Sequence, residues 1–254
     1  IIMENVPNDD LQKIIKDERN GHIKDGWDLT QKLINLYGIA SGMAYSVSYG
    51  ITHSDLKPEN ILMTNDLRPK ISDFDSARLE ADGNQQSFNM SGNDICSPLY
   101  TAPEVIQADD GYLKHSEKSD VYSFAMIAYE MITKEVPFRH YGQYKLFRAV
   151  CKGERPPIKS EVAEQYRNLI TNCWRQKPQE RPTFKEITEL LNTDKFLNDK
   201  EIDRKRFEEY VNYVANYKDS HTKSQFIRPK SEYDKKKGQK DDDDDEVLKH
   251  SDAI

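Results

Sequence analysis

Hydrophobic residues recur every three or four positions along several stretches of the chain, which predicts a mostly helical fold. The longest stretch follows Asp28 and ends at Gly50, since glycine readily ends a helix. Asp28 is a good N-cap, and Gln31 three residues later indicates a capping-box-like start. We therefore expect one long helix with a buried face that includes Leu29, Leu33, Tyr37, Ala40, Ala44 and Val47.

A second helix is predicted over residues 118–134, and it is hydrophobic nearly all round. Such a helix belongs in the centre of a domain. Asp120 at its start is an unusual place for a charge unless backbone N–H groups surround the carboxylate. A simple partner for the helix dipole is the alternative for Asp120. The apolar positions are Val121, Phe124, Ala125, Ile127, Ala128, Met131 and Ile132.

Shorter helices follow. One is expected near 142–152, ended by Gly153, and another over about 160–174. Pro182 is well placed to start a third, because proline suits the first helical position. A last helix is indicated beyond residue 196. The apolar face of the 160–174 helix holds Val162, Tyr166, Leu169, Ile170 and Cys173, and that of the last helix Ile202, Phe207, Tyr210, Val211 and Val214.

Composition adds a polar segment to this helical domain. Of 254 residues, 36% are hydrophobic and 32% are charged, and residues 220–254 mix Lys and Asp runs with few apolar side chains. We predict that this tail is disordered. The acidic run 241–246 carries six of the seven net negative charges. The remainder is nearly neutral, which gives no electrostatic argument for nucleic-acid binding.

Cysteine use and hydropathy point to an intracellular, cytoplasmic protein. Cys96, Cys151 and Cys173 are widely spaced, so neither a disulfide framework nor a zinc site is indicated. The sequence has no apolar run of about 18 residues and opens with no signal-peptide pattern. We expect no membrane partner, and the sequence leaves the oligomeric state open.

The candidate chemistry lies after the long helix, in the run His53-Ser54-Asp55-Leu56-Lys57-Pro58-Glu59-Asn60. Asp73-Phe74-Asp75 and Ala102-Pro103-Glu104 follow in order. An Asp-x-Lys pair alone is common in solvated loops, but the ordered set resembles the catalytic loop, metal triplet and closing triplet of a protein kinase. The run 173–184, Cys-Trp-Arg-Gln-Lys-Pro-Gln-Glu-Arg-Pro-Thr-Phe, resembles the tyrosine-kinase-like group.

This resemblance covers residues 1–196 and implies a mostly α, protein-kinase-like fold: a C-lobe with the N-lobe largely missing. Phosphoryl transfer needs positioning and charge neutralisation. The resemblance makes Asp55 the acceptor of the substrate hydroxyl proton and directs Lys57 to the γ-phosphate of ATP. Asn60 and Asp73 would hold Mg²⁺ through hard oxygen ligands. Lys57 also favours a protein Ser/Thr substrate over tyrosine.

The resemblance implies an adenine pocket at the start of the chain. Met3 would be the gatekeeper, and the main chain of Glu4 and Val6 would pair with adenine. Asp10 stands where the family often contacts ribose, and Leu62 resembles the floor of the pocket. A short edge strand with a turn is the alternative for residues 1–7.

Supporting residues are implied as well. His53 would be a packed core histidine that stacks on Phe74, Asp120 would hold the catalytic loop, and Arg181 would form a buried ion pair with Glu104. Ser97 matches the family's loop threonine near the catalytic Asp.

Several residues depart from the family pattern. Ser54 replaces an arginine that usually grips an activation-loop phosphate, so we predict that this control is absent. Asp75 replaces a glycine, and Cys96 replaces another. Asp75 is either a solvated loop residue or an extra carboxylate near the metal. Ser87 and Ser91, like Ser97, are candidate phosphorylation sites.

The expected organisation is a hinge and strand end over 1–10, a C-lobe over 11–196, an accessory helix over 197–219 and the tail over 220–254. The chain opens with Ile1 rather than methionine, so we interpret it as a piece of a longer product. The glycine-rich loop, strand lysine and partner glutamate are not in it, so weak or no turnover is expected of the piece alone. The alternative function is a non-catalytic, pseudokinase-like scaffold or binding module.

Overall fold

The predicted long helix is α2 (Leu29–Ser48) in the computed structural model, which describes residues 9–81, 84–85, 98–108 and 115–222. Asp28 Oδ1 accepts the Gln31 N–H at 2.8 Å, so the predicted N-cap is confirmed. The capping box is wrong, because the Gln31 side chain donates to the Leu67 carbonyl at 2.7 Å instead. Asn35 donates to the same oxygen. Leu67 is buried, and an unpaired carbonyl there would be costly.

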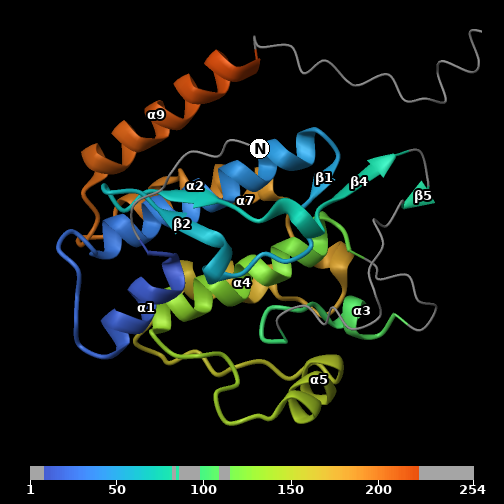
Figure 1. The fold of residues 1–254 in the computed structure, drawn as a ribbon. Helices are drawn as coiled ribbons and strands as arrows, with labels where there is room; N and C mark the ends of the chain where they lie inside the picture. The colour runs from blue at the N-terminus through green and yellow to red at the C-terminus, as the bar shows by residue number, and fades with distance from the viewer. Residues whose placement is uncertain (1–8, 82–83, 86–97, 109–114, 223–254) are drawn as a thin grey trace, which may run out of the picture. The chain divides into compact units, whose positions relative to one another are not determined.

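The second predicted helix is α4 (Glu117–Thr133), and it lies in the core as expected. All of its residues from Ser119 to Met131 are buried. Helix α4 packs against α2 and α6 (Glu164–Cys173), and α7 (Phe184–Leu191) packs along α2. Figure 1 shows α2, α4 and α7 close together. A helix that is apolar on every side is stable only where neighbouring elements cover all of its faces, as they do for α4.

The shorter helices complete this part of the chain. They are α1 (Leu11–Arg19), α3 (Pro103–Ile106), α5 (Gln143–Cys151), α8 (Asp194–Leu197) and α9 (Arg204–Thr222), with 3-10 turns η1 (Pro58–Asn60), η2 (Phe74–Ser76) and η3 (Pro178–Glu180). Helix α5 matches the 142–152 prediction, and Gly153 after it has φ 86°. A positive φ is cheap for glycine, which explains the stop there.

Two predicted helix starts are wrong by a few residues. Helix α6 begins at Glu164 and not near 160, because residues 159–162 form a turn in which Val162 N–H donates to the Lys159 carbonyl at 3.2 Å. Helix α7 begins after Thr183, which is its N-cap. Thr183 and Glu186 form a reciprocal capping box, so Pro182 precedes the cap and does not occupy the first helical position.

The strands are short and pair into two small antiparallel sheets. One joins β1 (Ile51–Thr52), β4 (Arg78–Ala81) and β5 (Asn84–Gln85) in that order. The other is a hairpin of β2 (Ile61–Met63) and β3 (Pro69–Ile71), with Ile61 opposite Ile71. We call this second pair the β2–β3 hairpin. It packs on α2.

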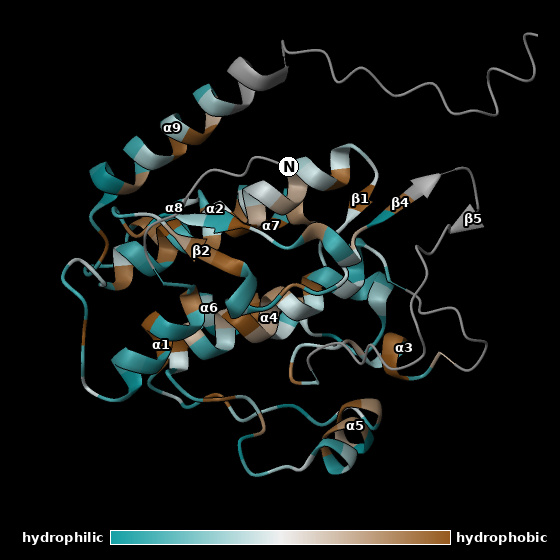
Figure 2. Ribbon diagram, viewed as in Figure 1, coloured by the Kyte–Doolittle hydropathy of each residue, from teal (hydrophilic) through white to brown (hydrophobic). Residues whose placement is uncertain are grey.

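The chain divides into two units, Ile1–Val214 and Ala215–Ile254. The described residues of the second unit are the C-terminal turns of α9, which extends to Thr222 and so three residues into the predicted tail. The rest of the tail, residues 223–254, lies outside the described residues. In Figure 2, β2 is coloured hydrophobic and α9 is largely hydrophilic. None of the described helices has the length and apolar character needed to cross a membrane.

Candidate active site

The loop after α2 is held by a buried carboxylate from α4. Asp120 Oδ2 accepts the His53 N–H at 2.7 Å, and Oδ1 accepts the Ser54 N–H at 3.0 Å. These are the backbone partners that the sequence required for a charge at this position. Burial raises the pKa of Asp120 to about 7, although the two N–H bonds favour its ionised form. Ser54 has φ 69°, so the loop turns sharply just before Asp55.

Asp55, Lys57 and Asn60 converge on one oxygen. Lys57 Nζ lies 2.5 Å from Asp55 Oδ2, and Asn60 Nδ2 lies 3.3 Å from the same atom. The side chains of Asp55 and Lys57 are about one-fifth exposed, at 18% and 21%. Within the described residues, Asp55 Oδ1 receives no hydrogen bond. The two donors therefore neutralise Oδ2 and leave Oδ1 without a hydrogen bond from the described residues.

Asn60 is oriented by the main chain around it. Its side-chain Nδ2 also donates to the Asp55 main-chain carbonyl at 2.8 Å. The main-chain carbonyl of Asn60 accepts from Ser72 N at 2.9 Å and from Ser72 Oγ at 3.0 Å. Because the amide nitrogen is used, Oδ1 of Asn60 is the atom left for a ligand. Sequence reasoning missed Ser72; the signal was a small hydroxyl residue directly before Asp73.

Asp73 follows the β2–β3 hairpin on an exposed turn. It adopts φ 61° and ψ 62° and makes no capping bond to the following turn η2. His53 is fully buried, and its Nε2–H donates to the Ser72 carbonyl at 2.9 Å, while Nδ1 accepts the Asp55 N–H at 3.3 Å. Its ring lies 4.7 Å from that of Phe74. The expected His53–Phe74 contact is thus present. Burial lowers the pKa of His53, which favours a neutral ring and a packing role, although Asp55 and Asp73 both oppose the shift.

The nucleotide side of the predicted site is partly described. Asp10 forms an antiparallel bridge with Leu62, so these two predicted contacts are adjacent. Asp10 Oδ1 is the N-cap of α1 and accepts the Lys13 N–H at 2.8 Å. Leu62 is half-buried. Met3, Glu4 and Val6 lie outside the described residues, as do Ser87, Ser91, Cys96 and Ser97.

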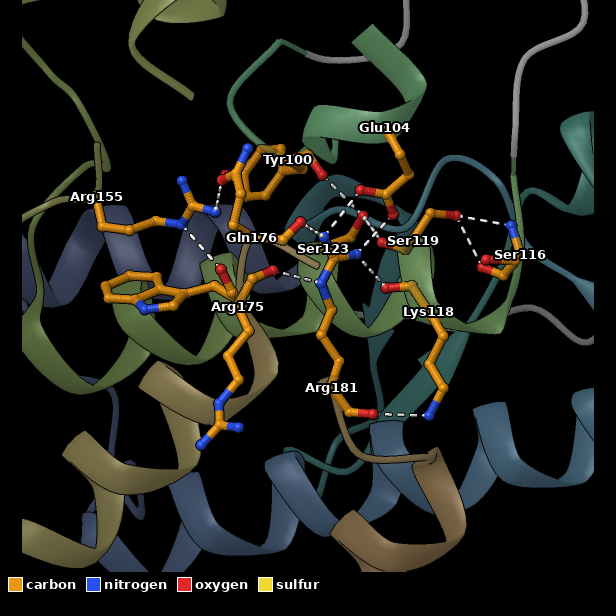
Figure 3. Close-up of polar contacts among 11 residues, drawn as sticks. Tyr100, Glu104, Ser116, Lys118, Ser119, Ser123, Arg155, Arg175, Gln176 and Arg181 are labelled. Atoms are coloured by element: carbon orange, nitrogen blue, oxygen red, sulfur yellow. Dashed lines mark hydrogen bonds and ion pairs between the residues drawn. The ribbon is translucent and has the colours of Figure 1, made fainter. Parts of the chain in front are cut away.

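The predicted ion pair between Arg181 and Glu104 is present, and Figure 3 shows it within a wider network. Arg181 Nη1 and Nη2 donate to the two carboxylate oxygens of Glu104 at 2.6 and 2.8 Å. Arg181 Nη1 also donates to the Lys118 carbonyl, while Lys118 Nζ donates back to the Arg181 carbonyl, both at 2.8 Å. The network joins Glu104 of α3, Lys118 of α4 and Arg181, which directly follows η3.

A second buried carboxylate was not predicted. Glu130 in α4 is fully buried; Arg19 Nη2 lies 2.6 Å from one of its oxygens, and Tyr100 Oη donates to the other at 2.7 Å. This ties α1 and the segment before Ala102 to the central helix. An acidic residue inside an otherwise apolar helix was the available signal, as it was for Asp120.

The donor set fits a hard divalent cation. Asn60 offers an amide oxygen and Asp73 an exposed carboxylate, and Mg²⁺ commonly takes one or two protein oxygens together with substrate phosphates. Across the described residues, no group of three or more His, Cys, Asp and Glu side chains gathers as a metal cage.

Comparison with known proteins agrees with this geometry. The family model described as protein tyrosine and serine/threonine kinase matches residues 1–191. The chain is 36% identical over 188 residues to the dual specificity protein kinase shkD of Dictyostelium discoideum, covering 72% of this chain and 24% of that protein. It is 32% identical to the dual specificity protein kinase shkC of the same organism, covering 76% and 37%.

A third Dictyostelium discoideum relative, RGS domain-containing serine/threonine-protein kinase A, is 34% identical over 73% of this chain and 15% of its own length. The chain thus spans less than two-fifths of each of these three relatives. The mostly helical fold and the family match agree with a kinase-like fold that lacks much of the N-lobe. The chain belongs to the protein kinase family.

Proposed function

We propose that the polypeptide containing this chain transfers the γ-phosphoryl group of ATP to serine or threonine hydroxyls of a protein, with Mg²⁺. The observation that carries the proposal is the convergence of Lys57 Nζ and Asn60 Nδ2 on Asp55 Oδ2. Those two contacts fix the carboxylate and leave Oδ1 to face a substrate hydroxyl. A fixed carboxylate within reach of the hydroxyl is what a general base requires.

Each residue then has a separate task. Asp55 orients the hydroxyl and takes its proton as the oxygen attacks phosphorus. Lys57, one-fifth exposed, can turn from Asp55 to a phosphate oxygen, because its ammonium is a mobile point charge. Asp120 keeps the loop in place through main-chain bonds to residues 53 and 54. Preorganised groups of this kind supply much of the catalysis of phosphoryl transfer.

Asn60 and Asp73 would hold the metal. When bound, Mg²⁺ neutralises charge on the transferred phosphoryl group. The β2–β3 hairpin sets the relation between the two ligands, since Asn60 precedes β2 and Asp73 follows β3. Asp10 and Leu62, joined by the bridge, would line the ribose and adenine side of the nucleotide.

Lys57 supports a Ser/Thr substrate through the family resemblance of its loop. The printed names of the relatives include serine/threonine and dual specificity kinases. Tyrosine phosphorylation is therefore an outcome that the assay must report separately. We also propose an intracellular location, in line with cysteine usage; among the described cysteines, Cys151 and Cys173 form no disulfide.

The test compares phosphate transfer by the encoded polypeptide that contains these residues with transfer by its Asp55→Asn form. Loss of the base should lower the rate about 100-fold or more. Asp66→Asn, at an exposed turn residue, is the matched control and should retain activity. Phosphoamino acid analysis of the product distinguishes Ser/Thr from Tyr. Equal rates for the parent and Asp55→Asn would refute the proposed mechanism.

A non-catalytic scaffold is the second candidate. It is favoured by Ser54 and Asp75, which replace residues that the family usually uses for activation-loop control and for loop flexibility. If the polypeptide is a scaffold, its parent and Asp55→Asn forms should bind a partner equally well, and neither form should transfer phosphate.

A further inference from the structure

Helix α9 lies beyond the family match, which ends at residue 191, yet its first half is built into the core. Phe207 is fully buried and Tyr210 is 5% exposed. The Tyr37 ring of α2 meets both of them edge-on, at centroid distances of 5.4 and 6.3 Å. Large buried aromatic side chains contribute strongly to packing, so this segment is an integral part of the Ile1–Val214 unit.

The same half of α9 contacts the turn of the β2–β3 hairpin. The Arg68 guanidinium lies 4.7 Å from the Tyr213 ring and 5.7 Å from the Tyr210 ring. Those two rings are stacked, with centroids 6.1 Å apart. Cation–π contacts of this kind favour one position of the guanidinium over the rings. Arg68 also closes the hairpin turn, because its N–H donates to Thr64 Oγ1 and its carbonyl accepts the Thr64 N–H, both at 3.0 Å.

Gly38 is where α2, α9 and the hairpin meet. A Cβ atom at residue 38 would overlap Tyr210 Oη and lie 2.6 Å from Pro69 Cγ. One turn later, a Cβ at Gly42 would lie 2.9 Å from Ile71 Cδ1. The absence of both side chains lets β3 and Tyr210 approach the α2 backbone closely. The β3 end of the hairpin and Tyr210 Oη therefore meet the α2 backbone at the same residue.

This hairpin connects the two proposed metal ligands. Asn60 comes directly before β2, and Asp73 comes two residues after β3. The Ser72 N–H and hydroxyl bind the Asn60 carbonyl across its open end. Pro69 is thus linked to Asp73 by three intervening residues of the chain, and one of them, Ser72, is hydrogen-bonded to Asn60. Residues outside a metal's own ligands commonly tune its affinity by orienting those ligands.

Resting on the proposed function, we propose that Tyr210, acting with Arg68, is a positioning residue that holds the β2–β3 hairpin so that Asn60 and Asp73 present their oxygens to Mg²⁺. The contact that holds the hairpin is the one between the Tyr210 ring and Arg68, while Tyr210 Oη lies against the α2 backbone at Gly38. The role lies in a segment that the family model does not include.

The experiment measures nucleotide binding by the encoded polypeptide that contains these residues, as Mg²⁺ is titrated. Tyr210→Ala should raise the Mg²⁺ concentration for half-maximal binding about 10-fold, in the range found for other residues that orient metal ligands. Tyr210→Phe keeps the ring and should restore the parent value. Phe196→Ala is the matched control, because Phe196 is also fully buried in the C-terminal segment but its ring packs on Tyr166 of α6.

Hydrogen exchange provides a readout that does not depend on nucleotide. Amides of Ile61–Met63 and Ile71 should exchange faster in Tyr210→Ala than in Phe196→Ala. If the parent binds nucleotide with Mg²⁺ and Tyr210→Ala shows the same Mg²⁺ dependence, the positioning role is overturned. If the parent shows no Mg²⁺-dependent binding, the proposed function itself fails. If the hairpin amides exchange hydrogen at equal rates in Tyr210→Ala and Phe196→Ala, Tyr210 does not hold the hairpin in place, whatever the nucleotide-binding measurement gives.

Discussion

Replacing Arg181 with alanine should destabilise the fold more than most single substitutions, because many groups depend on its guanidinium. The side chain is fully buried, and that of Glu104 is only 16% exposed. Besides Glu104, the guanidinium donates to the carbonyls of Arg175, Lys118 and Gln176 at 2.8, 2.8 and 3.3 Å. Alanine leaves a largely buried carboxylate and three carbonyl oxygens without this donor.

The expected cost follows from that inventory. Removing one partner of a buried ion pair costs about 3–5 kcal/mol. The carbonyl groups place Arg181→Ala at the upper end, since each lost bond contributes about 1 kcal/mol. For a domain of this size the change corresponds to a fall of about 6–20 °C in the unfolding midpoint. Arg181→Lys keeps the charge but not the fork of donors, so its loss should be intermediate.

The assay is urea unfolding at pH 7 for the parent, each single variant and the double variant Glu104→Leu/Arg181→Met. If the charges depend on each other, the double variant loses less stability than the sum of Glu104→Leu and Arg181→Met. An Arg181→Ala chain as stable as the parent would refute the reasoning. Additive losses would show that the two side chains act separately.

Two further predictions concern Asp120 and Gly38. The pKa of Asp120 is raised by burial to about 7, so between about pH 4 and pH 7 the folded chain retains a proton that the unfolded chain has lost, and stability should fall as pH rises through that window. Asp120→Asn should remove this slope in urea unfolding, and parallel profiles for the two chains would contradict the assignment. Gly38→Ala should cost about 1–3 kcal/mol by crowding Tyr210 and Pro69. Gly142→Ala, where an added Cβ meets no atom, should lose less than about 1 kcal/mol, and an equal loss in both would argue against the close approach at residue 38.

The sequence predicted the helices whose hydrophobic pattern is long and regular. The bounds of α2 and α4 came within two residues, because their apolar faces and the Asp28 cap are local signals. The starts of α6 and α7 were misplaced, because a turn at Lys159 and the Thr183–Glu186 capping box compete with periodicity and with proline. Such competition depends on a few hydrogen bonds that hydropathy does not encode.

The charged residues of the candidate site could be predicted from the sequence, because they belong to loop motifs that occur in a fixed order along the chain. The Arg181–Glu104 pair and the His53–Phe74 contact were both expected from the resemblance and are present. The hydrogen bonds from Ser72 to Asn60 and the contact of Tyr210 with Arg68 were not predicted. The local signals were a hydroxyl residue before Asp73 and an apolar position in the last helix, and neither names the partner in another segment.

The Asp120 carboxylate holds the loop after α2 through the main-chain N–H groups of residues 53 and 54. Because these bonds run to main-chain N–H groups, they do not depend on the polarity of the side chain at residue 54. They do depend on the backbone there, which has φ 69° at a buried position. Proline at residue 54 would remove one N–H, and a β-branched residue would strain the turn, so either change should loosen the loop from α4.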